Sequence, residues 1–167
     1  WLGERPLVIF TGTFGEVNGV EYLIRVAEGV RAQAPDVRFA LFGAGRDVER
    51  VRALAADLGL LDRSVFIHEP VPKARIAEWL AAADVSVALF RGPAVVWKDA
   101  VQNKFFDAIA SGCAVACNFD GWQTRVAEEA GVGFRLDPED PAAAAKTLVR
   151  RLRDRGSGHS DALLLAA

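Results

Sequence analysis

Short apolar runs alternate with segments of helical periodicity along almost the whole chain. The apolar runs have the length of single strands and lie at 7–12, 37–43, 64–68, 84–90, 113–118 and 133–137. The helical segments lie at 18–34, 46–58, from the turn at 69–73 to about 83, 102–112, 121–130 and 141–153. Nearly continuous apolar strands separated by helices are typical of a parallel sheet covered on both faces. The sequence therefore predicts an α/β fold: a doubly wound, six-stranded, mostly parallel, Rossmann-like sheet with helices on both faces.

Two polar residues are predicted to begin helices. Asn18 precedes Glu21 by three positions, which is the spacing of a capping box, so we expect Asn18 to cap the first helix. Asp120 stands directly before the segment 121–130, and we expect it to cap that helix.

The strand order locates the expected binding crevice. In the common order 3-2-1-4-5-6, the order reverses between the first and the fourth strand, and ligands bind outside the carboxyl ends of the strands there. The loops 12–19 and 91–103 would flank this crevice. The second loop is the longest connection in the chain, and long loops in compact domains are usually functional. We therefore expect binding residues in these two loops and in the helix that follows.

The composition is that of an ordinary globular domain. Of the 167 residues, 51% are apolar and 25% are charged, and the net charge is -2. The lack of a basic excess argues against a dedicated nucleic-acid-binding protein. No apolar run is long enough for a transmembrane helix and no signal peptide opens the chain, so we predict a cytoplasmic protein. The chain begins at Trp1 and contains no Met, so we expect a fragment, with one domain at 1–155 and an unassigned tail at 156–167.

Two further features each have two interpretations. Cys113 and Cys117 lie in one short apolar strand, where their thiols cannot connect distant parts of the fold. We interpret them as buried thiols, with a metal or redox pair as the alternative. The basic cluster at 150–155 ends the last predicted helix, where it is interpreted as solvated and favourable to the helix dipole. Contact with an anionic lipid surface is the alternative for this cluster.

Glycines follow the first two predicted strands. Gly12 and Gly15 allow a tight turn and a close approach of the backbone to an anion at the helix start, although a plain turn is an equal interpretation. The run 43–48 matches a dinucleotide fingerprint only in part, because it follows the second strand and has Val48 at the third glycine position. The sequence therefore does not favour a nicotinamide dinucleotide as the ligand.

The helix 102–112 carries the most informative polar residues. Asn103 and Asp107 are four positions apart, so they lie on one face near its N-terminal end, and Asp99 lies in the loop before it. The start of this helix can hold a phosphate, and Lys104 can add positive charge. Carboxylates beside a phosphate are explained if they accept hydrogen bonds from the hydroxyls of a ribose and a sugar. Alternatively, both carboxylates are solvated surface groups.

The segment NKFFDAIASG resembles part of a known family motif, the E-x7-E motif of retaining GT-B glycosyltransferases of family 4. Here the motif reads Asp99, seven residues, Asp107, and then Ala108, Ala110 and Gly112. The resemblance covers nearly the whole chain, through GTFGEVNGVEYLI, FALFGAG and SVFIHEPVPKARIAEWLAAADVSVAL. The combination of NKFFDAIASGCAV with DGWQ is most similar to bacterial members that build surface polysaccharides, some of which transfer deoxyaminosugars.

The resemblance implies an enzyme with two Rossmann-like domains and an active site between them. This chain would be the C-terminal domain, which binds the nucleotide-sugar donor, usually a UDP-sugar. Its partners would be the N-terminal domain of the same polypeptide and an acceptor glycan or lipid-linked glycan. The isolated domain would then bind a nucleoside diphosphate but transfer nothing. The resemblance also implies that the full-length enzyme contacts the inner face of the plasma membrane as a peripheral protein.

The resemblance also assigns the site, position by position. Asp107 would hold the ribose hydroxyls, and Asp99, the catalytic residue, would hold the donor hexose. The other residues would contact the phosphates or the base; they are Gly12, Thr13, Gly15, Gln102, Asn103 and Lys104, with main-chain groups near Val71 reading the base edge. No metal or other cofactor is implied, because a helix dipole and basic groups stabilise the departing nucleoside diphosphate.

The chain departs from the family pattern in two ways. Both motif acids are Asp rather than Glu, and the basic residues usual in the first loop are replaced by Thr13 and Asn18. Lys104 is the nearest replacement cation, with Arg91 and Lys98 as alternatives. Two other functions stay open: a GT-B nucleotide-sugar epimerase, whose additional carboxylates and histidines we do not find, and a non-catalytic glycosyltransferase-like nucleotide-binding module.

Overall fold

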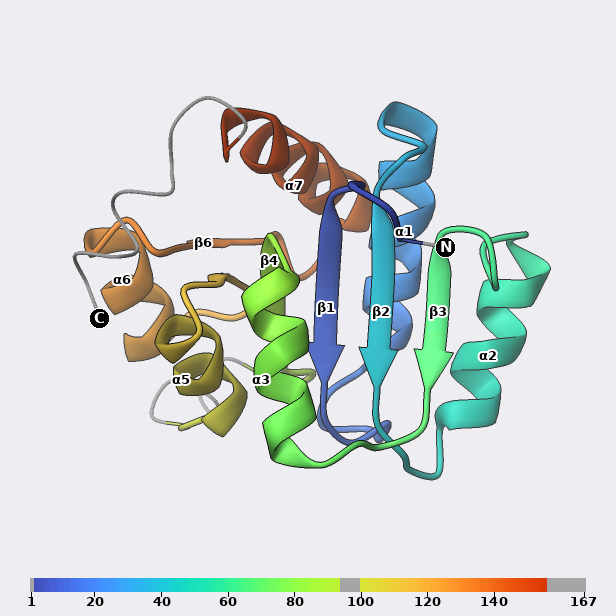
Figure 1. Cartoon of the computed structure of the whole chain (residues 1–167), viewed down its shortest axis with the longest axis horizontal. Helices are drawn as coiled ribbons and strands as arrows, with labels where there is room; N and C mark the ends of the chain where they lie inside the picture. Colours follow the sequence, from blue (N-terminus) through green and yellow to red (C-terminus); the bar gives the residue numbers. More distant parts are fainter. Residues whose placement is uncertain (1, 94–99, 156–167) are drawn as a thin grey trace.

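A computed structural model describes residues 2–93 and 100–155. Six strands form one sheet in the order β3-β2-β1-β4-β5-β6, and every neighbouring pair is parallel (Figure 1). The strands are β1 (Leu7–Thr11), β2 (Arg38–Phe42), β3 (Val65–His68), β4 (Val85–Ala88), β5 (Ala114–Cys117) and β6 (Gly133–Arg135). The predicted doubly wound sheet and its strand order are confirmed.

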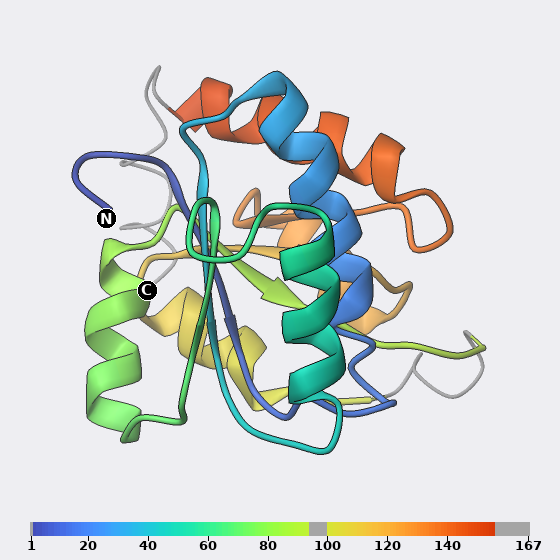
Figure 2. The ribbon, with the colours of Figure 1, turned by 90° about the vertical axis from the view of Figure 1, so that its right-hand side faces the viewer.

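Helices cover both faces of this sheet (Figures 1 and 2). One face packs against α1 (Glu21–Gln33), α2 (Val48–Asp57) and α7 (Pro141–Arg155). The other face packs against α3 (Lys73–Ala82), α5 (Asn103–Ala110) and α6 (Trp122–Glu129). No helix in the described ranges has the length and apolar character needed to span a bilayer.

The strands are mostly apolar because helices cover both faces of the sheet. In β1, Val8 and Phe10 point into the core on the α1 side, whereas Leu7 and Ile9 point into the core on the α3 side. Successive side chains of a strand alternate between faces, so a strand between two helical layers needs apolar residues at every position. All four side chains are at most 1% exposed.

The two cysteines are buried and free, as the sequence predicts. Both Cys113 and Cys117 belong to the core on the α3 side of the sheet. Burial raises the pKa of the Cys117 thiol to about 12, so this thiol stays protonated and unreactive at neutral pH.

The starts of α1 and α6 differ from the prediction. Neither helix has a side-chain hydrogen bond at its cap, and α1 begins only at Glu21. Asn18 lies in the turn before α1, where its side-chain amide donates a hydrogen bond to the Thr13 carbonyl at 2.8 Å. Asp120 forms an ion pair with Arg135 at 2.7 Å. The two capping predictions are therefore wrong, because both side chains contact other segments.

The loops that follow β1 and β2 remain hydrogen-bonded to each other beyond the sheet. Gly12 N–H donates to the Phe42 carbonyl and Phe14 N–H donates to the Ala44 carbonyl, each at 2.9 Å. A Cβ atom on Gly43 would lie 1.8 Å from the carbonyl oxygen of Gly12. Only a glycine lets the two backbones approach this closely. The close backbone contact therefore explains the glycine after the second strand, and no bound dinucleotide is needed to explain it.

This contact generates a prediction for Gly43→Ala. The new methyl group would collide with the Gly12 backbone, so we expect the free energy of unfolding to fall by about 1–3 kcal/mol, the usual cost of overpacking. Gly15→Ala is the matched control, because its Cβ would meet nothing closer than 3.7 Å and its φ is not positive. Urea unfolding measures both variants, and equal stabilities of the two would contradict the backbone contact.

Candidate functional site

A cleft of about 490 Å³ lies at the carboxyl ends of β1 and β4, where the strand order reverses. Its walls come from the β1–α1 loop, from the start of α3 and from the start of α5. The lining residues are Thr11, Gly12, Thr13, Asn18, Val71, Lys73, Ile76, Phe90, Val101, Gln102, Asn103, Lys104 and Asp107. The structure therefore brings most of the predicted site residues together in one place.

A second hollow of about 330 Å³ continues this cleft toward β2. The two share Thr11, Gly12, Thr13, Val71 and Ile76. The remaining lining of the second hollow consists of apolar side chains and glycine backbone; these residues are Phe42, Gly43, Ala44 and Pro70. The result is a continuous trough with an apolar end near β2 and β3 and a polar end near α5.

Lys104 supplies the positive charge at the polar end of the trough. Its Nζ donates a hydrogen bond to Asn18 Oδ1 at 3.2 Å and lies 4.3 Å from the centre of the Phe10 ring. Within the described part of the chain, no carboxylate lies within 4.0 Å of this ammonium group. Burial lowers the pKa of Lys104 to about 8. The site therefore holds a partly buried cation that lacks a described counter-ion.

The ammonium group needs the glycine at position 12. A Cβ atom on Gly12 would lie 2.9 Å from Lys104 Nζ, and Gly12 adopts a φ of +145° that favours glycine. Asn18 connects the two sides of this contact, because it accepts from Lys104 and donates to the Thr13 carbonyl. The β1–α1 loop carries no lysine or arginine between Gly12 and Gly19, so α5 provides the cation that reaches it.

A buried amide pair holds the start of α5 in position. Gln102 N–H donates to Gln123 Oε1 at 3.1 Å, and Gln123 Nε2 donates back to the Gln102 carbonyl at 3.3 Å. The side chain of Gln102 also donates to the Leu89 carbonyl at 2.8 Å. The N–H group of Gln102 is thus directed to the protein interior. The N–H groups of Asn103 and Lys104, in the first turn of α5, have no partner within the helix.

Asp107 lies one turn into α5 and forms an ion pair with Lys73 at 3.0 Å. Lys73 begins α3, so the ion pair bridges two walls of the cleft. The Asp107 side chain is 31% exposed, and a ligand in the cleft can therefore reach its carboxylate.

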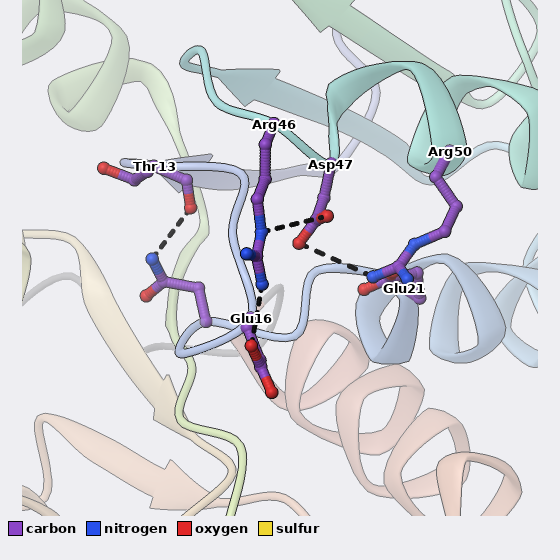
Figure 3. A network of polar contacts seen from close by, with 7 residues as sticks. Thr13, Glu16, Glu21, Arg46, Asp47 and Arg50 are labelled. Carbon is purple, nitrogen blue, oxygen red and sulfur yellow. Dashed lines mark hydrogen bonds and ion pairs between the residues drawn. The ribbon is translucent and has the colours of Figure 1, made fainter.

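A network of ion pairs holds the outer side of the β1–α1 loop (Figure 3). Arg46 contacts Glu16 at 2.7 Å and Asp47 at 3.7 Å, and Arg50 contacts Asp47 at 3.5 Å and also Glu21. Both arginines are mostly exposed, so each pair stabilises the fold by only about 0–1 kcal/mol. Together the pairs connect the loop after β1 and the start of α1 to the start of α2.

Some predicted site residues lie elsewhere. Gly15 does not line the cleft; its carbonyl accepts the N–H groups of Asn18 and Gly19 in the turn before α1. Arg91 lines a neighbouring pocket of about 820 Å³ on the α1 side of the sheet, which shares Phe90 with the cleft. Asp99 and Lys98 lie outside the described residues, as does the tail 156–167.

Sequence reasoning missed Lys73 and Gln123. Gln123 carried a usable signal, because it shares a helix face with Ala127, and a polar side chain on an apolar face indicates a buried hydrogen bond. It is 0% exposed. Lys73 carried no such signal, because its partner lies 34 positions away on another helix and a single lysine at a helix start is common.

The fold and the trough define a doubly wound α/β domain with a cleft at the switch point of its sheet. Residues 5–154 match the family model of group 1 glycosyl transferases, which is nearly the whole of the described chain. The protein belongs to this family, and it corresponds to the C-terminal, Rossmann-like domain of these GT-B enzymes. The motif resemblance and the sheet topology agree with this assignment.

Individual relatives show the same relationship. A D-inositol 3-phosphate glycosyltransferase of Xylanimonas cellulosilytica is 32% identical over 163 residues, which are 92% of this chain and 35% of that protein. The chain thus spans about a third of the length of this curated relative.

Two solved structures share the fold. The HepE protein of Anabaena, crystallised in complex with UDP-glucose, matches with a TM-score of 0.79 and 19% identity over 99% of this chain and 44% of its own. The C-terminal domain of the LpcC protein of Francisella tularensis matches with a TM-score of 0.68 and 19% identity over 98% of this chain and 81% of its own.

The lowered pKa of Lys104 predicts a pH dependence of stability. The unfolded chain keeps the lysine proton up to about pH 10.5, whereas the folded chain releases it above about pH 8. Because only the unfolded state keeps the Lys104 proton between these values, the contribution of Lys104 to the free energy of unfolding increases with pH there. We expect a gain of up to about 3 kcal/mol.

This gain should be absent from Lys104→Met. Urea unfolding between pH 7 and 10.5 measures it, with Lys146→Met, an exposed lysine on α7, as the matched control. Parallel curves for the wild type and Lys104→Met would show that the ammonium group is not buried without a counter-ion.

Proposed function

We propose that this chain is the donor-binding half of a retaining glycosyltransferase, and that its trough binds the nucleoside diphosphate part of a nucleotide-sugar. The single observation that carries the proposal is the partly buried Lys104 ammonium group in the cleft, which contacts Asn18 and has no described carboxylate partner. A buried charge is costly unless an opposite charge compensates it. A diphosphate beside Lys104 would provide that charge and would also face the N–H groups at the start of α5.

The shape of the trough supports one orientation of the nucleotide. The apolar end contains Val71 and the Gly43 backbone, which suit a flat base held by stacking and main-chain hydrogen bonds. Asp107 lies between this end and the helix start, where its carboxylate can accept hydrogen bonds from ribose hydroxyls. The diphosphate then lies between Lys104 and Asn103.

In this orientation, the positive groups around the diphosphate would promote the transfer of the sugar. When the bond between the sugar and the diphosphate breaks, negative charge grows on the phosphate oxygens. Lys104 and the N-terminus of α5 are already placed beside these oxygens, so they stabilise the charge without rearrangement. A bound metal is not needed for this step. Asp99 of the family motif would contact the hexose, and it is the proposed catalytic residue of this chain.

The rest of the enzyme would supply the acceptor. We propose that an N-terminal domain of the same polypeptide closes the cleft, and that the transferred sugar joins a polysaccharide or a lipid-linked glycan at the cytoplasmic face of the membrane. A UDP-sugar is the proposed donor, since HepE, which shares this fold, was crystallised with UDP-glucose. The isolated domain should bind the nucleotide and transfer no sugar.

The role of Lys104 is tested by comparing two ligands that differ in their phosphates. Lys104→Ala should weaken UDP by about ten-fold or more and leave uridine nearly unchanged, because it removes a charge-assisted hydrogen bond of about 1.5–3 kcal/mol. Calorimetric titration with UDP, GDP, ADP and uridine gives the affinities, and Lys146→Ala is the matched control. If the wild type binds none of the nucleotides, or if Lys104→Ala binds UDP normally, the proposal fails.

The two acids of the motif should respond differently to the sugar. Asp107→Ala should weaken UDP and UDP-sugar alike, by about ten-fold, because both ligands carry the ribose. Asp99→Ala should leave UDP nearly unchanged and weaken only the UDP-sugar. Titration of both variants with UDP and UDP-glucose gives four affinities. Identical profiles for the two variants would assign both acids to the solvated surface.

A further inference from the structure

The ion pair between Lys73 and Asp107 bridges two helices of the cleft. Lys73 Nζ lies 3.0 Å from Asp107 Oδ1, and both residues line the cleft. The helices α3 and α5, which carry them, lie side by side on the same face of the sheet (Figures 1 and 2). The ion pair therefore connects the two walls at one point of the trough.

The ion pair adds little to the stability of the fold. The side chain of Lys73 is 80% exposed, and exposed ion pairs are weakened by water and salt. Asp107 is less exposed, at 31%, and its backbone is fixed within α5. The pair is thus better suited to orient the Asp107 side chain than to hold the domain together.

The contact uses one of the two carboxylate oxygens of Asp107. An ionised carboxylate has about four sites for hydrogen bonds, so Oδ2 and part of Oδ1 can still accept. Hydrogen bonds to hydroxyls depend on direction as well as distance. An ammonium group that holds Oδ1 restricts the rotation of the carboxylate and directs Oδ2 toward one part of the cleft.

Lys73 is also close to the apolar end of the trough. It follows Val71 by two residues, and Val71 lines both the cleft and the apolar hollow. The same turn therefore carries a wall of the hollow and the cation that contacts Asp107. A ligand that fills both the cleft and the apolar hollow would lie beside the Asp107 carboxylate. This turn would set the distance between the ligand and that carboxylate.

We propose that Lys73 is a positioning residue that orients the Asp107 carboxylate and thereby sets the preference of the site for ribose over deoxyribose. The inference rests on the proposed function, because it requires a nucleoside diphosphate in the trough. Lys73 acts through Asp107, whereas Lys104 contacts the diphosphate. Loss of Lys73 should therefore lower the discrimination between sugars in the nucleoside.

The experiment compares UDP with 2′-deoxy-UDP and 3′-deoxy-UDP by calorimetric titration of the chain. For the wild type, we expect at least one deoxy ligand to bind about ten-fold more weakly than UDP. For Lys73→Met, this ratio should fall to about three-fold or less, and Lys73→Arg should restore it. Lys146→Met is the control for the loss of a positive charge, and thermal unfolding should be nearly the same for all variants.

The outcomes separate the inference from the proposed function. An unchanged ratio in Lys73→Met, with normal binding of UDP by the wild type, overturns the inference alone. A loss of affinity shared equally by all three ligands also overturns it, because it would assign Lys73 to the phosphates. Failure of the wild type to bind UDP, GDP and ADP overturns the proposed function and the inference together.

Discussion

The backbone of the first loop lies directly against the backbone of the second loop at the carboxyl edge of the sheet. The contact between Gly12 and Gly43 leaves no room for a side chain on Gly43, and the two hydrogen bonds beside it fix the loop after β1. Because this loop is fixed, Gly12 stands at the bottom of the trough with its α-carbon toward α5. Lys104 can then place its ammonium group where a Cβ atom of residue 12 would come within 2.9 Å of it.

The charged groups of the trough do not balance one another. Lys104 is held by Asn18 and by the face of Phe10, neither of which carries a charge. Asp107, the one carboxylate among the described lining residues, already has Lys73 as its partner. The described cleft therefore keeps one excess positive charge, which suits an anionic ligand better than a neutral one.

The cation has a different origin in this chain from the one that the family resemblance implies. The resemblance expects basic residues in the loop after β1, where this chain has Thr13 and Asn18. In the structure, Lys104 reaches the same loop from α5 and contacts Asn18. Burial of a lysine costs free energy, which a domain tolerates when a ligand compensates it. Function and stability are thus opposed at this residue, as is common at binding sites.

The sequence by itself determined the fold class, and the commonest strand order of that class then indicated the region of the cleft. Continuous apolar strands such as β1 need helices on both faces, and the strand order then places the loops after β1 and β4 at one crevice. The tertiary structure alone decided the contacts of Lys104 with Asn18, of Lys73 with Asp107, and of Gln102 with Gln123. Each of these joins segments far apart in the chain, at distances set by the packing of helices on the sheet. Periodicity shows which face of an element is buried, but it carries no information on which side chains of two different elements meet.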